Sequence, residues 1–214
     1  MTHRPRTRER IIDAADELFY AQGLRAVSMD RIAEAAGVTK KTLYYHFRSK
    51  DDLMSAYLDA RDDQVVARYQ GWAGTSGTAA QRMERMFRSL GAASRDRAWR
   101  GCGFVRAAFE LADLPGHPAY LVARRHKERF EGWLRALLAD EGRPDAALLA
   151  RMLMIVLDGA IAQVLIHRSS AYADAAALAV RRLLGQQREL GAVPARTCVD
   201  LPGFARLSGA EAPA

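Results

Sequence analysis

The stretch "AGVTKKTLYYHFRSKDDL", from Ala36 to Leu53, places three lysines and an arginine beside two adjacent tyrosines. Lysine ammonium groups can donate to guanine O6 and N7, and a tyrosine can contact thymine methyl groups or phosphate oxygens. On a helix that begins at Lys40, Leu43 and Phe47 lie four residues apart and face inward. The outer side then carries Lys40, Lys41, Tyr44, Tyr45 and Arg48, flanked by Thr42 and His46 as phosphate donors. This side predicts contact with a DNA major groove; the alternative is a solvated basic helix.

A capped turn must position this segment. Thr39 is a typical N-cap residue, and Val38 can pack on Leu43 as a hydrophobic staple that sets the angle to the preceding helix. That helix begins at Ser28 and ends before Gly37, and one more amphipathic helix precedes it. Three short helices joined in this way predict a helix-turn-helix domain.

Helical periodicity continues through almost the whole chain, without sustained strand-like alternation or an internal repeat. Ser49 can cap a long fourth helix, and later Gly, Pro and Ser clusters separate further helices up to about Leu190. The class is therefore all-α, with about nine helices. We expect a helix-turn-helix domain in residues 1–50, a larger effector-binding and dimerisation domain in 51–190, and a loosely ordered tail in 191–214.

Charge supports a polyanionic partner. Half of the 214 residues are hydrophobic, which is enough for a buried core, and the net charge is +7 with a pI near 9.8. Residues 1–50 contain ten basic and six acidic side chains, so +4 of the +7 lies there. The excess favours nucleic acid near the helix-turn-helix, although it could also serve solubility alone.

Several classes of protein lack support in the sequence. Cys102 and Cys198 have neither CxxC nor metal-ligand spacing, so we expect no disulfide framework, no metal site and a reducing cytoplasm. The most apolar run, from Met152 to Leu157, stops at Asp158, which argues against a membrane anchor, and we find no export signal. There is no Gly-rich phosphate loop, HExxH or GxSxG motif, so an enzyme is disfavoured and no cofactor is expected.

The segment "MDRIAEAAGVTKKTLYYHFRSKDDLM", with the helix from Arg8 to Gln22 before it, resembles the DNA-binding domain of the tetracycline-repressor (TetR) family of bacterial transcription regulators. The resemblance covers about Arg8 to Tyr57 and is carried by "AGV", "TLYYHF" and "SK". It implies that Lys40, Lys41 and Tyr44 face bases. It also implies backbone phosphate contacts by Ser28, Thr42, Tyr45, His46 and Lys50, to which we add the cap residue Thr39.

One position departs from the family. Family members often have glycine or another small residue where this chain has Lys41, so any base preference there must be its own. A basic arm of Arg4, Arg6, Arg8 and Arg10 could add minor-groove or phosphate contacts, or could simply be solvated.

Beyond residue 51 the resemblance rests on helix count and length. It implies that the fourth helix links the DNA-binding domain to an effector pocket and that the last two long helices form a four-helix dimer interface. The segment "LLARMLMIVLDGAIAQVLIH" is apolar nearly all round, and the next helix has small residues on one face (Ala175, Ala179). We expect a homodimer with Ala179 and Ile161 at the interface; a monomeric core helix is the alternative.

Pocket candidates lie on the middle helices, although each could equally be plain core. They are Met86, Phe87, Phe104, Tyr120, His126, Phe130 and Trp133. His126 lies on an apolar side, as a satisfied core histidine or as a ligand contact. Asp158 needs a partner, either Arg106 or Arg125 or a cationic effector. Cys102 fits a buried thiol better than a redox sensor.

These features together predict a ligand-responsive transcriptional regulator in the cytoplasm, most simply a repressor. It would bind a palindromic operator in double-stranded DNA as a homodimer and be released by a small, mostly apolar effector. The alternatives are an architectural or ligand-independent DNA-binding protein and, with less support, an all-α enzyme.

Overall fold

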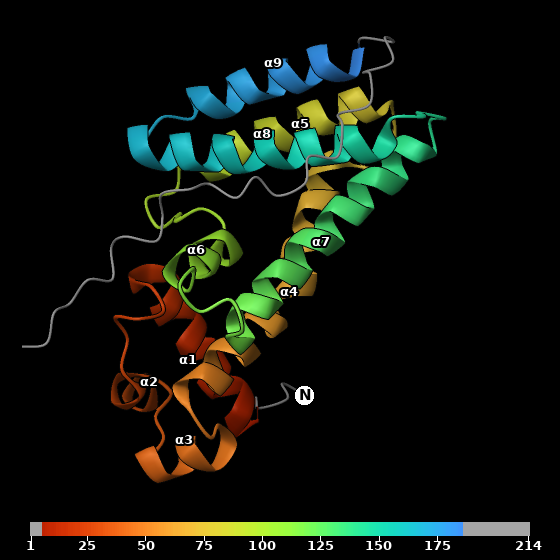
Figure 1. Cartoon of the computed structure of the whole chain (residues 1–214). Helices are drawn as coiled ribbons and strands as arrows, with labels where there is room; N and C mark the ends of the chain where they lie inside the picture. The colour runs from red at the N-terminus through yellow and green to blue at the C-terminus, as the bar shows by residue number, and fades with distance from the viewer. Residues whose placement is uncertain (1–5, 186–214) are drawn as a thin grey trace, which may run out of the picture.

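The computed structural model describes residues 6–185, which form nine helices without any strand (Figure 1). The prediction of an all-α chain is therefore confirmed for this range. The tail expected in 191–214, together with Cys198 and Arg4, lies outside the described residues.

The first three helices form the helix-turn-helix unit: α1 (Thr7–Gln22), α2 (Met29–Ala35) and α3 (Lys40–His46). Their common core contains Ile11, Ile32 and Leu43, which are fully buried. The predicted caps are present, because Ser28 Oγ accepts from the Arg31 amide at 3.2 Å and Thr39 Oγ1 accepts from the Thr42 amide at 3.1 Å. Capping and core packing together set the angle between α2 and α3.

A long helix joins this unit to the rest of the molecule. It is α4 (Lys50–Ala73), capped by Ser49, whose Oγ accepts from the Asp52 amide at 3.1 Å. Figure 1 shows α4 and α7 (Pro118–Ala139) side by side, running from the helix-turn-helix at the bottom to a layer of helices at the top. Because α4 is continuous, movement at its far end can be transmitted to its own start and to the end of α3 just before it.

The upper layer consists of α5 (Ala79–Ala93), α8 (Ala146–His167) and α9 (Ala171–Gly185). Small residues let α5 and α9 approach closely, since a Cβ on Gly91 would lie 3.2 Å from Ala173 Cβ. The short α6 (Gly103–Glu110) lies between this layer and α1 (Figure 1). The loop of residues 94–102 connects α5 to α6.

Two hydrophobic clusters fill the molecule, and neither ends at residue 50. One is built mainly from α5, α8 and α9 with the ends of α4 and α7. The other joins the helix-turn-helix core to Phe104 and Leu111 near α6 and to Val122 of α7. The helix-turn-helix therefore shares its core with α6 and α7, whereas the division of the chain at residue 50 stays a prediction.

Candidate nucleic-acid interface and effector cavity

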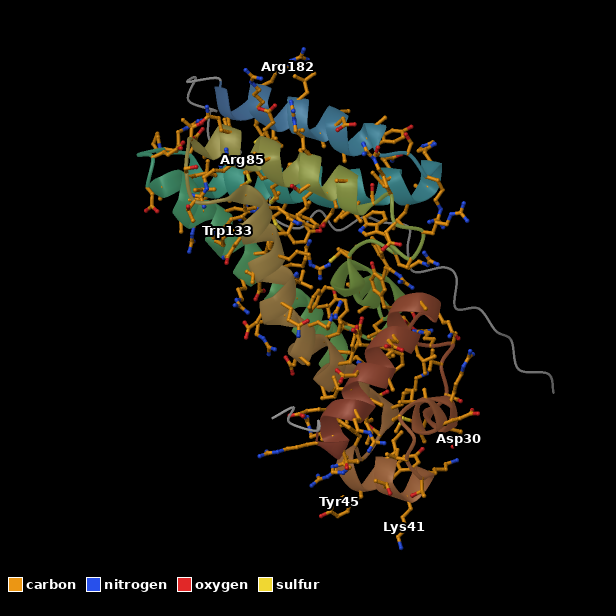
Figure 2. The ribbon with its side chains drawn as sticks, turned by 180° about the vertical axis from the view of Figure 1, so that it is seen from behind. Asp30, Lys41, Tyr45, Arg85, Trp133 and Arg182 are labelled. Atoms are coloured by element: carbon orange, nitrogen blue, oxygen red, sulfur yellow. The ribbon has the colours of Figure 1, made fainter. Side chains whose placement is uncertain are left out.

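The outer side of α3 is open to solvent at the end of the molecule farthest from α9. We call it the reading face; it consists of Lys40, Lys41, Tyr44 and Tyr45 of α3 and of Arg48, which follows the end of the helix, and all five are exposed. Figure 2 shows Lys41 and Tyr45 pointing away from the body of the protein. Leu43 and Phe47 are buried on the opposite side, as their spacing predicts. An aromatic side chain as exposed as Tyr45 (85%) gains little by packing and is available to a partner.

The two lysines of the reading face have different surroundings. Lys40 Nζ lies 2.7 Å from Asp30 Oδ1, and the hydrogen bond to this carboxylate raises the pKa of Lys40. Among the described residues no acidic side chain pairs with Lys41. A DNA phosphate or base would therefore have to displace Asp30 from Lys40, whereas Lys41 is unoccupied.

The other predicted contact residues surround this face, and several already form local bonds. The Ser28 and Thr39 hydroxyls serve as caps, and Thr42 Oγ1 lies 2.9 Å from Thr39 Oγ1. His46, half-buried, stacks edge-on against Tyr45. Lys50 Nζ donates to the Arg25 carbonyl at 2.9 Å, and burial lowers its pKa. All nine predicted DNA contacts thus gather at one end of the molecule, while the contacts themselves stay predictions.

The basic arm divides into two kinds of residue. Arg10 Nη2 donates to the Ala36 carbonyl at 2.6 Å and the Gly37 carbonyl at 3.2 Å, so it braces the turn before α3. Arg8 lies over the Phe47 ring at 5.1 Å, and Arg6 is exposed. Of the three, Arg10 has a structural role that the sequence pattern did not suggest.

A cavity of about 390 Å³ lies above the helix-turn-helix. Its walls come from the end of α1, the middle of α4, the loop after α5 and the start of α6. The aromatic lining residues are Tyr20, Tyr57, Tyr69, Trp72, Trp99 and Phe104. Its volume and aromatic lining suit a small, largely apolar molecule.

The charged side chains in the lining of this cavity are Arg61, Arg68 and Asp96, and Asp16 lies outside the lining beside Arg61. Arg61 Nη1 lies 2.8 Å from Asp16 Oδ2, yet Asp16 Oδ1 has no partner among the described residues, and burial raises the pKa of this carboxyl. Burial also raises the pKa of Tyr57, which is therefore a neutral phenol able to donate. Cys102 lines the wall half-buried, and burial raises the pKa of its thiol, which argues against a reactive thiolate.

The cavity is not where most of the predicted pocket residues lie. Of the seven, Phe104 alone appears in its lining. Met86, Phe87 and Phe130 pack in the upper hydrophobic cluster. Tyr120 packs against the lower cluster, and Trp133 lies half-buried on α7, on the far flank labelled in Figure 2. Contact of the seven residues with a ligand stays a prediction.

His126 is a satisfied core histidine in this structure. Its Nδ1 lies 2.6 Å from Asp62 Oδ1, and its ring stacks on Phe104 with centroids 3.6 Å apart. Arg129 Nη1 donates to the other Asp62 oxygen at 2.9 Å. We call these four residues the joint, because they connect α4, α6 and α7.

Electrostatics in the joint favour a neutral imidazole beside a carboxylate. Burial lowers the pKa of His126, against the opposing hydrogen bond to Asp62. Burial tends to raise the pKa of Asp62, but the hydrogen bonds from His126 and Arg129 together hold it below its usual range. His126 therefore donates from Nδ1 to an ionised Asp62.

The predicted partner of Asp158 was wrong. Lys127 Nζ donates to Asp158 Oδ1 at 2.6 Å, whereas Arg106 donates to the Tyr20 carbonyl and Arg125 pairs with Asp59. Asp158 is also half-exposed rather than buried. Helical geometry brings Lys127 and Asp158 together from α7 and α8, which sequence spacing does not reveal.

The upper layer leaves an apolar surface uncovered in the single chain. Ile155 and Ile166 on α8 are each 68% exposed, and Leu178 and Ala179 on α9 are exposed as well. Ile161, however, is buried on the side of α8 that packs against the loop before α6, so its predicted place at a dimer interface was wrong. Its position in the helix turns it to the core side.

The apolar helix α8 is the one described helix long and apolar enough to cross a membrane by length and composition. In this structure one side of it packs in the upper cluster, as expected for the core helix of a folded domain. Among the described residues no three His, Cys, Asp or Glu side chains gather as metal ligands would.

Comparison with known proteins agrees with the helix-turn-helix geometry of residues 11–57. The sequence model of a family described as "Bacterial regulatory proteins, tetR family" matches residues 11–57. The chain is 26% identical over 170 residues to the HTH-type transcriptional regulator YjdC of Escherichia coli (strain K12), covering 79% of this chain and 88% of that one. It is 28% identical over 140 residues to the HTH-type transcriptional repressor KstR2 of Mycolicibacterium smegmatis, covering 65% of this chain and 66% of that one.

Likeness to a solved structure extends over the later helices as well. The crystal structure of SCO4454, a TetR-family transcriptional regulator from Streptomyces coelicolor, superposes with a TM-score of 0.74 at 33% identity. The match covers 84% of this chain and 96% of that one. The likeness therefore includes both the helix-turn-helix and the helices that enclose the cavity.

Proposed function

This chain belongs to the TetR family of bacterial transcriptional regulators, and from that premise we propose that it is a ligand-responsive repressor acting as a homodimer on a palindromic operator. The family regulates transcription rather than catalysing a reaction. A regulator of this kind acts on chromosomal DNA, which in a bacterium lies in the cytoplasm.

One observation carries the DNA-binding part of the proposal: cationic and aromatic side chains are exposed together on α3. Lys41 and Tyr44 would meet base edges, while Thr42, Tyr45 and Lys50 would bind backbone phosphates. The test is selection of binding sequences from random duplex DNA by the purified protein. A palindrome with half-sites one helical turn apart is expected, and selection of no sequence at all would contradict the proposal.

The uncovered side of α8 and α9 supports the homodimer. It presents Ile155, Ile166, Leu178 and Ala179, and an apolar surface of this kind is usually buried by a partner. Ala179→Glu should weaken association measured by sedimentation, because it would bury a charge against apolar side chains. Ala136→Glu, on the exposed side of α7, is the matched control and should leave the dimer intact.

The cavity supports the effector response. It touches α1 through Tyr20 and α4 along more than three turns from Tyr57 to Trp72, so a molecule bound there would press directly on the helix-turn-helix connection. Two α3 helices must stand about 34 Å apart to enter successive major grooves, so a shift of a few ångströms would weaken both half-sites. By linkage, operator DNA must weaken effector binding by the same factor.

The effector response can be tested without knowing the natural ligand. Compounds that raise the melting temperature would be selected from a library of small aromatic molecules, and operator affinity would then be measured with each at saturation. A lower affinity is expected. Unchanged affinity with every stoichiometric ligand would favour the alternative, a ligand-independent DNA-binding protein.

A further inference from the structure

A second hollow, of about 500 Å³, lies between the loop after α5 and the end of α8. We call it the arginine groove, because four of its eight lining residues are Arg95, Arg97, Arg100 and Arg168. Asp96 is the one acidic residue in the lining. The groove therefore concentrates positive charge on a short loop far from the reading face.

The charged groups of the groove divide into those that shape the loop and those that are available. Asp96 Oδ1 accepts from the Ala98 amide at 2.8 Å, and Arg100 Nη1 donates to the Arg97 carbonyl at 2.5 Å, so both hold the turn. Arg95, Arg97 and Arg168 are exposed. Within residues 6–185 none of these three guanidinium groups forms an ion pair or a side-chain hydrogen bond.

The arginine groove adjoins the cavity. Asp96 and Trp99 line both hollows, so the loop that carries them is a shared wall. The loop is held firmly, since Gly101 has a φ of +76° and a Cβ there would lie 2.7 Å from Leu165 Cδ1 on α8. Because the two hollows meet at Asp96 and Trp99, a molecule that is longer than the cavity and extends over Trp99 would place its end among the arginines.

We propose that the arginine groove binds an anionic group, a phosphate or a carboxylate, carried by an effector whose aromatic or apolar body occupies the cavity. Guanidinium groups match both anions with paired hydrogen bonds, and a cationic end would instead meet three unpaired like charges. The inference rests on the proposed effector cavity and adds the chemical class of its ligand. It also gives this segment, "SRDRAWRG", a role beyond that of a solvated turn.

The test compares three probes with one body: 1-naphthyl phosphate, 1-naphthoate and 1-naphthol, titrated calorimetrically into the full chain without DNA. At least one anionic probe should bind about tenfold more tightly than the neutral one, with a preference that weakens as salt is raised. The double variant Arg95→Gln/Arg97→Gln should lose most of this preference, and so, separately, should Arg168→Gln. Arg135→Gln, an exposed arginine on α7, is the matched control and should keep it.

Two outcomes would overturn the inference. One is a charge preference that is absent, or present but unchanged in the arginine variants. The other concerns the case in which no naphthyl probe binds. Pyrophosphate alone should then bind the native chain and not the double variant, and any other result with pyrophosphate would overturn the inference. The affinities of 1-naphthyl phosphate and 1-naphthoate, compared with each other, show whether the groove prefers a phosphate or a carboxylate.

Operator affinity, measured on the same protein, keeps this inference distinct from the proposed function. If the protein binds its operator but shows no charge preference among the probes, the anion subsite is refuted and the proposed DNA-binding function stands. If probe binding depends on the arginines but a saturating probe leaves operator affinity unchanged, the effector response is refuted and the anion subsite stands.

Discussion

The reading face and the joint both combine charged and aromatic side chains, yet their surroundings are opposite. On the reading face Tyr45 is 85% exposed and Lys41 has no ionic partner among the described residues. In the joint His126 is 3% exposed, stacks on Phe104 and bonds Asp62, which Arg129 also binds. Charged and aromatic groups thus point outward at the reading face, where Lys40 alone pairs with an acidic side chain among the described residues, and satisfy one another in the joint.

The two sites therefore differ in whether their polar groups contribute to the free energy of folding or to that of binding. Polar groups that satisfy each other inside the chain contribute to folding and have little left for a partner. Groups left exposed contribute little to folding, and their interaction energy becomes available when a partner arrives. Substitutions at the two sites should therefore separate stability from binding, and the following experiments test that separation.

The largest effect is expected in the joint. Phe104→Ala should lower the free energy of unfolding by about 3–5 kcal/mol, because it removes a fully buried ring that also forms a wall of the cavity. Tyr45→Ala, the matched aromatic deletion on the reading face, should change it by less than about 0.5 kcal/mol. Urea unfolding of both variants gives the comparison; similar losses would remove the distinction between the two sites.

On the reading face the expected effect is on DNA alone. Lys41→Ala should cost about 1–3 kcal/mol of operator binding and relax the preference at one base position, while unfolding stays unchanged. Lys40→Ala should cost less in binding, since DNA must first displace Asp30 from Lys40. Fluorescence anisotropy with operator and random duplexes measures both, and an equal loss on the two DNAs would show that Lys41 reads no base.

Much of the reading face could be predicted because its determinants are local. Thr39, Leu43 and Phe47 lie within nine residues, and capping and helical spacing alone assign the inner and outer sides of α3. The cavity depends instead on contacts between Tyr20, Tyr69 and Trp99, which come from three distant segments. Helical periodicity marks such residues as apolar without saying which of them face each other.

One feature of the sequence could have indicated the joint. Asp62 lies four residues after Leu58 and four before Val66, in the middle of the buried stripe of α4. A carboxylate at that position requires a partner inside the protein, whereas Asp158, for which we expected a buried partner, is half-exposed. The partner, His126, is 64 residues away, and only the packing of α4 against α7 identifies it.

Acid should weaken the joint. The pKa of His126 is lowered by burial, so below about pH 6.5 the unfolded chain takes up a proton that the folded chain does not. Stability therefore falls with decreasing pH, by at most about 1.4 kcal/mol per pH unit from this group, and the lowered pKa of Asp62 extends the same trend to lower pH.

The variant His126→Gln isolates this contribution. It should flatten the decline in unfolding free energy between about pH 6.5 and 5, because the titrating ring is gone. His46→Gln, at the reading end of the molecule, should keep the decline of the native protein. Unfolding by urea at a series of pH values measures the slopes; equal slopes for native protein and His126→Gln would show that the joint is not the acid-sensitive group.

The smallest effect is expected from a substitution that tests whether the cavity is coupled to the DNA-binding unit by a route other than α4. Tyr20, near the end of α1, accepts from the Arg100 amide at 2.9 Å and donates to the Gly101 carbonyl at 3.2 Å, so its hydroxyl ties the DNA-binding unit to the loop shared by the cavity and the arginine groove. Tyr20→Phe removes both hydrogen bonds but keeps the ring. Because the half-buried backbone groups left behind can bind water, the free energy of unfolding should fall by only about 1 kcal/mol. Because α3 is untouched, operator affinity without effector should stay within about twofold of native.

If the loop transmits part of the response, the drop in operator affinity caused by a saturating ligand should become smaller in Tyr20→Phe, while ligand affinity in the absence of DNA is retained. An undiminished drop would show that the two bonds of the Tyr20 hydroxyl carry none of the response, which would leave the connections through α4 and α6.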